Sequence, residues 1–180
     1  MKGDEMDKEG KVYGGVAELF EWIADRVPGY RAYRAREKLR DADKKVREFL
    51  AGKLTSVKEK LTNIKRRLTD AGRLKGLDKI DFVIRKLERI RDTALFAERG
   101  FSGVFDPNKV REDKLAELYR YDRALIERVE VMIATLEEFT ASPAPGADIA
   151  SMTAKLDDLL DRFDAELSRR GELIGSIDKE

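Results

Sequence analysis

The stretch LAGKLTSVKEKLTNIKRRL, residues 50–68, decides the fold class of this chain. Its apolar side chains recur alternately four and three positions apart, at Leu50, Leu54, Val57, Leu61, Ile64 and Leu68. This spacing places all six on one face of an α-helix and is typical of helices that pack as coiled coils do. We predict that the helix runs from about Arg31 to Ala71, and that a turn bracketed by Gly72 and Gly76 ends it.

A second seam of the same kind lies between residues 115 and 139. Its members are Leu115, Leu118, Asp122, Leu125, Val129, Met132, Leu136 and Phe139, and all are apolar except Asp122. Three further segments have an amphipathic helical pattern: Val16 to Val27, Asp78 to Arg99, and a last helix that begins near Ala147. No segment has the alternation of a strand.

The connections between these segments are short, which favours antiparallel neighbours. We therefore predict an all-α fold: an elongated antiparallel four-helix bundle with coiled-coil-like packing and a short N-terminal amphipathic helix. The expected organisation is a disordered tail over residues 1–12, the short helix and a Pro-Gly corner over 13–29, and the bundle domain over 30–180. Pro28 ends the short helix because a proline disfavours helical angles at the residue before it.

The amino-acid composition excludes several classes of functional site. The 180 residues include neither Cys nor His, which excludes thiolate nucleophiles, disulfides, most hydrolytic triads and the common zinc sites. No phosphate-binding glycine motif is present, and the formal net charge is only +1. We expect no cofactor, no metal and no small-molecule substrate. The charged start and the lack of a long apolar run predict a cytoplasmic protein.

Charge is shared unevenly among the predicted helices. Residues 31–71 hold fourteen basic and six acidic residues, whereas residues 147–180 hold five basic and nine acidic ones. Tyr30 and Tyr33 are interleaved with the first cations of the basic segment, among them Arg34, Arg36 and Arg40. These five residues are the predicted binding face.

Three interpretations of the basic segment remain open. The basic helix could pack beside the acidic C-terminal helix, so that their charges pair. It could bind phosphate groups of nucleic acid or of anionic lipid, with the tyrosines as stacking groups. It could instead dock a protein, since Tyr and Arg are common hot-spot residues.

The residues around this corner carry a resemblance. Pro28-Gly29-Tyr30-Arg31-Ala32-Tyr33 is followed by a charged segment beginning Glu37-Lys38-Leu39-Arg40. This arrangement resembles the opening of uncharacterised prokaryotic helical proteins that have a Pro-Gly-Tyr-Arg-x-Tyr turn before a charged helix. The resemblance covers about twenty residues, and it implies a helical fold but no activity.

Two acidic features and one amphipathic segment have alternative explanations. Asp122 in its apolar seam favours an ion pair with an Arg or Lys of a facing helix, or a hydrogen bond to a Tyr, over a catalytic or metal-binding role. The acidic run of the last helix favours a solvated or salt-bridged face over a Mg²⁺ or Ca²⁺ site; its members are Asp157, Asp158, Asp161, Asp164 and Glu166. The N-terminal segment around Trp22 favours packing on the bundle over a membrane surface, because its polar face is acidic.

The sequence thus predicts a non-enzymatic helical interaction or scaffold protein. Its Tyr/Arg face would meet a protein partner or another copy of the chain. The alternative is a polyanion binder, for nucleic acid or an anionic membrane surface, acting through the basic helix over residues 31–67.

Overall fold

The computed structural model describes residues 15–34, 38–96, 110–141 and 149–177. All of its regular elements are helical, as predicted, and the helices pack on one another. In chain order they are α1 (Val16–Arg26), the short 3-10 helix η1 (Tyr30–Tyr33), α2 (Leu39–Asp70), α3 (Leu77–Phe96), α4 (Glu112–Ala141) and α5 (Ile149–Ile177). The predicted tail over residues 1–12 lies outside the described residues.

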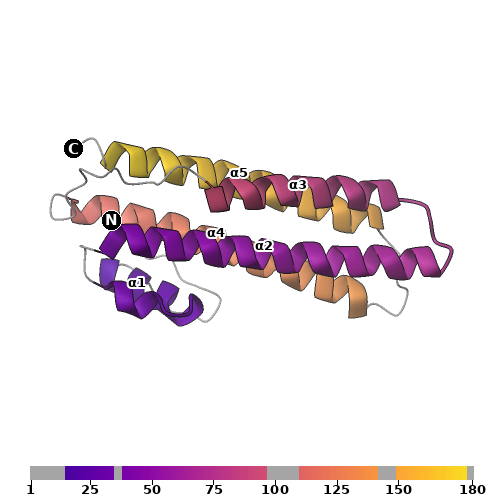
Figure 1. Ribbon diagram of the computed structural model, residues 1–180, viewed down its shortest axis with the longest axis horizontal. Helices are drawn as coiled ribbons and strands as arrows, with labels where there is room; N and C mark the ends of the chain where they lie inside the picture. Colours follow the sequence, from indigo (N-terminus) through magenta and orange to yellow (C-terminus); the bar gives the residue numbers. More distant parts are fainter. Residues whose placement is uncertain (1–14, 35–37, 97–109, 142–148, 178–180) are drawn as a thin grey trace, which may run out of the picture.

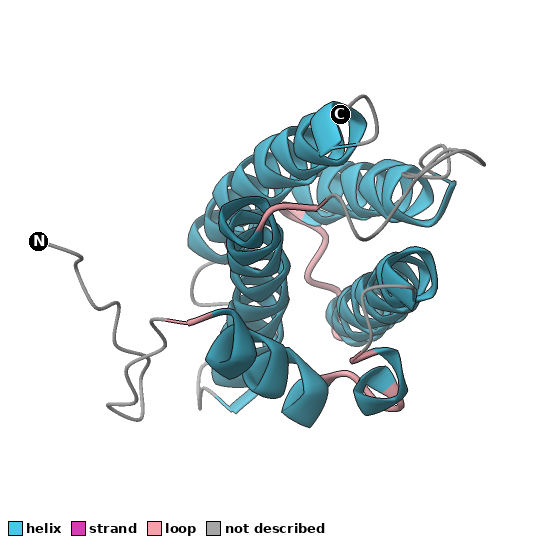
Figure 2. Ribbon diagram, turned by 90° about the vertical axis from the view of Figure 1, so that its left-hand side faces the viewer, coloured by secondary structure: helices cyan, strands magenta, loops and turns pink. Residues whose placement is uncertain are grey.

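Helix α1 ends where the sequence predicts. Val27, next to Pro28, has extended backbone angles (φ −98°, ψ 106°), and Gly29 turns the chain with φ +79°. The apolar face of α1 is fully buried, so this helix packs on the bundle. Its main neighbour is α4, and it also contacts η1. The end-on view shows the helices packed beside one another (Figure 2).

Helix α2 begins later than predicted. Instead of a continuous helix from Arg31, the chain forms η1 and enters α2 only at Leu39. The physical reason is the packing of Tyr30, whose ring lies 5.1 Å from that of Phe20 in α1. The residues after the Pro-Gly corner therefore fasten α1 to the bundle before the long helix starts.

The end of α2 confirms the predicted turn. Gly72 and Gly76 have φ values of +70° and +88°, which only glycine adopts without strain. The amide of Arg73 donates to the carbonyl of Leu68 at 2.8 Å, and that of Gly72 donates to Thr69 at 2.9 Å. These two bonds are the Schellman arrangement that satisfies the last carbonyls of a helix.

The four long helices form two hairpins that lie side by side (Figure 1). Helix α2 packs antiparallel to α3, with Lys65 opposite Asp81, and α4 packs antiparallel to α5. Between hairpins, however, α2 lies along α4 and α3 lies along α5. These contacts are parallel, because Asp43 and Lys60 of α2 lie level with Asp122 and Glu137 of α4.

This arrangement differs from the one expected from short connections. The prediction placed every helix antiparallel to the next, but α3 packs on α2 and α5 rather than on α4. The segment between α3 and α4 joins helices that lie diagonally opposite. Within each hairpin the seam residues are buried, and together with α1 they form one core.

Gly76 couples the two hairpins, and this gives a stability prediction. A Cβ at Gly76 would lie 3.2 Å from Cγ2 of Ile149 in α5, whereas one at Gly72 would meet no heavy atom within 4 Å. We expect Gly72→Ala to cost about 1–2 kcal/mol through its left-handed backbone alone. Gly76→Ala should cost more, because Ile149 must also shift. Urea denaturation of both variants measures the difference.

Gly52 provides the internal control for this comparison. It lies exposed inside α2, and a Cβ there would meet no heavy atom within 4 Å. Gly52→Ala should therefore stabilise the protein by about 0.5–1 kcal/mol, since glycine loses more backbone entropy on folding. An equal loss of stability for Gly72→Ala and Gly76→Ala would contradict the role given to Ile149.

Candidate interaction surfaces

The predicted Tyr/Arg face is not one exposed surface. Tyr30 is buried, with 1% of its surface exposed, so its inclusion in a docking face is wrong. Tyr33 is half-buried with its ring 6.4 Å from that of Tyr30, while Arg34 and Arg40 are exposed. Arg36 lies outside the described residues.

Acidic residues of α1 compensate the cations around η1. Arg31 donates to Glu21 at 2.6 Å and to Asp25 at 2.5 Å, and Arg34 lies 3.6 Å from Glu21. All of these side chains are at least partly exposed, so each pair contributes little to stability. Their effect is to hold η1 beside α1 and to lower the net charge of the predicted face.

Tyr30 instead belongs to a polar cluster inside the bundle. Its neighbours include Phe20 and Tyr119, whose rings lie 6.1 Å apart. Burial raises the pKa of Tyr30 well above its ordinary value of 10.0, and the negative charge of nearby Asp122 raises it further. The hydroxyl therefore stays protonated in the folded protein.

Asp122 forms the buried ion pair that the seam pattern predicts. Its Oδ1 accepts a hydrogen bond from Nε of Arg170 in α5 at 2.5 Å. Nη1 of Arg170 donates to Asp43 of α2 at 2.6 Å, and all three side chains are at least 96% buried. Arg47 also pairs with Asp43 at 3.0 Å and reaches the carbonyl of Leu95 in α3. Arg170 thus links α5 to both α2 and α4, a role that the sequence did not reveal.

The acidic run of α5 is salt-bridged, which confirms the favoured explanation. Asp157 and Asp161 pair with Lys86 of α3, Asp164 with Arg89 of α3, and Glu166 with Arg128 of α4; Asp158 pairs with Arg162 within α5. The acidic helix is therefore neutralised by α3 and α4. The interpretation that paired it with the basic helix is wrong, because α2 packs on α3 and α4 instead.

The basic helix α2 pairs most of its middle cations across the seams. Lys58 and Lys65 reach Glu88 and Asp81 of α3 at 3.2 and 2.5 Å, and Lys60 reaches Glu137 of α4 at 3.0 Å. The end of the α2–α3 hairpin is different. Within the described residues, no ion pair involves its exposed cations, which are Arg66, Arg67, Arg73, Lys75 and Lys79.

We define this region, residues 66–79, as the hairpin end. It contains five cations but only two acidic residues, Asp70 and Asp78, which are also exposed. Leu74 lies between Arg73 and Lys75 with 65% of its surface exposed. The hairpin end therefore combines excess positive charge with an exposed apolar side chain.

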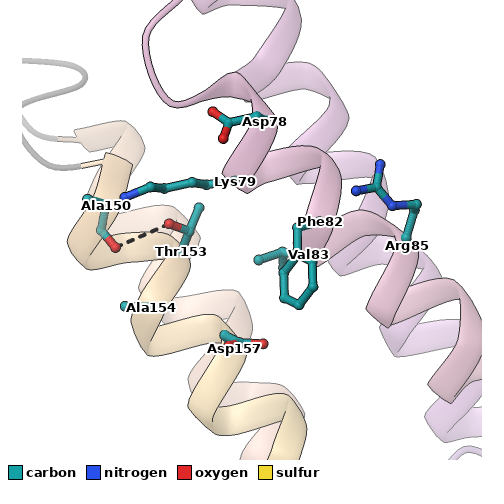
Figure 3. Close-up of a pocket in the computed structure, with 9 residues that line it drawn as sticks. All are labelled: Asp78, Lys79, Phe82, Val83, Arg85, Ala150, Thr153, Ala154 and Asp157. Carbon is teal, nitrogen blue, oxygen red and sulfur yellow. Dashed lines mark hydrogen bonds between the residues drawn. The ribbon is translucent and has the colours of Figure 1, made fainter.

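A groove opens beside the hairpin end, between the first turns of α3 and α5 (Figure 3). It has a volume of about 500 Å³. Phe82 and Val83 line it from α3, and the small side chains of Ala150, Thr153 and Ala154 line it from α5, with Asp78, Lys79, Arg85 and Asp157 around them. Phe82 lies across the opening with 52% of its surface exposed.

Two negative findings apply to the described ranges only. There, no group of three or more acidic side chains is placed to hold a metal ion. None of the helices found in those ranges has the length and apolarity needed to cross a bilayer.

Removing the buried arginine gives the second prediction. Arg170→Met would leave Asp43 and Asp122 buried without their shared partner, and we expect a loss of about 3–5 kcal/mol of unfolding free energy. Replacing both carboxylates as well, in Asp43→Asn/Asp122→Asn/Arg170→Met, should restore most of the loss. Guanidinium denaturation followed by circular dichroism measures both variants. A loss below about 1 kcal/mol for the single variant contradicts the central role of Arg170.

Tyr30 gives a pH-dependent prediction. The unfolded chain releases the tyrosine proton near pH 10, whereas the folded chain retains it because the pKa of Tyr30 is raised. Its contribution to stability is thus fully present below about pH 10 and is lost as the pH rises further. Wild type should lose up to about 1.4 kcal/mol per pH unit there that Tyr30→Phe does not lose.

Urea denaturation at pH 8, 10 and 11 measures this difference. Tyr33→Phe, which removes the hydroxyl of a half-buried tyrosine, is the matched control and should follow wild type. Parallel curves for wild type and Tyr30→Phe across the range would show that Tyr30 ionises as readily in the folded chain as in the unfolded one.

Comparison with known proteins adds no relative to this picture: no protein-family model, curated protein or solved structure matches the chain. Functional statements about this protein therefore rest on its own contacts and charges.

Proposed function

We propose that this chain is a cytoplasmic, non-enzymatic helical interaction protein. Its four long helices act as one elongated four-helix bundle, which presents the hairpin end to an acidic surface of a partner protein. The observation that carries the proposal is the contrast in charge pairing. Several cations along the helix seams have acidic partners, whereas the five cations of the hairpin end, two of which flank the exposed Leu74 in sequence, take part in no ion pair among the described residues.

The energetics support a protein partner. Exposed cations without partners cost nothing to leave in water, but they attract and orient an acidic surface during encounter. Leu74 adds exposed apolar area between Arg73 and Lys75, and docking sites usually combine apolar and polar groups in this way. The hairpin end thus takes the place of the predicted Tyr/Arg face, whose Tyr30 is buried.

The second candidate is a polyanion binder, and the same cations support it. Arg66 and Arg67 extend the unpaired charge from the turn back along α2, within the segment first predicted to bind phosphates. Binding to DNA through about five phosphate contacts should weaken several-hundred-fold between about 50 and 200 mM salt. Leu74 contributes nothing to such binding, so Leu74→Ser separates the two candidates.

The test compares capture of partner proteins from a lysate of the source organism. Arg73→Glu/Lys75→Glu reverses two charges of the hairpin end, and Leu74→Ser removes its apolar side chain. The matched control is Arg120→Glu/Arg169→Glu, which makes the same charge change at two other exposed arginines. We expect one protein to be retained by wild type and by the control, and lost with both hairpin-end variants.

The polyanion alternative is tested separately with the same wild-type and variant proteins. Fluorescence anisotropy with a mixed-sequence DNA duplex and co-sedimentation with anionic vesicles are measured at both salt concentrations. Strong, salt-sensitive binding that Leu74→Ser leaves unchanged would replace the protein-docking proposal with the polyanion one. Partner capture that all variants share equally would remove the hairpin end from the function.

A further inference from the structure

We draw no further inference here: the strongest candidate, the groove between the first turns of α3 and α5, is lined by as many acidic as basic side chains, and nothing in the described structure shows what covers it.

Discussion

The buried arginine of α5 sets the frame on which the other features depend. Arg170 lies between Asp43 of α2 and Asp122 of α4, so one guanidinium holds three helices at the same level. A buried charge is tolerated only when its partners surround it closely, and any slip of one helix would leave a carboxylate unpaired. This requirement fixes the register of the hairpins at the end of the molecule that α1 covers. Gly76 against Ile149 does the same, by shape, at the opposite end.

Charge pairing along the seams follows from that register. Once α3 lies along α5, Lys86 and Arg89 come within reach of the acidic run of the last helix. Once α2 lies along α3, its middle lysines find Glu88 and Asp81. These pairs neutralise charges between neighbouring helices, whereas the cations of the hairpin end take part in no ion pair among the described residues. The hairpin end lies beyond this internal matching.

Much of the fold could be predicted because helix formation depends mainly on local sequence. The heptad spacing from Leu50 to Leu68 specifies a helix with one buried face, and Pro28 and Gly72 specify where helices stop. Asp122 is a similar case, because a lone carboxylate in an apolar seam requires a positive partner wherever it is buried. The kind of partner was predictable from this rule, but Arg170 was not, since forty-eight residues separate the two in sequence.

The sequence by itself determined the helices, their buried faces and the need for a charge partner at Asp122. Only the tertiary structure decided which helices are neighbours, that Tyr30 is buried and that Phe82 is exposed. The physical reason is that the spacing of apolar residues specifies which face of a helix is buried, but does not specify which element packs against that face. A tyrosine beside arginines has the same local pattern whether another helix packs over it or water does. That choice is made when α1 folds over one end of the bundle and the two hairpins lie side by side, parallel where they meet.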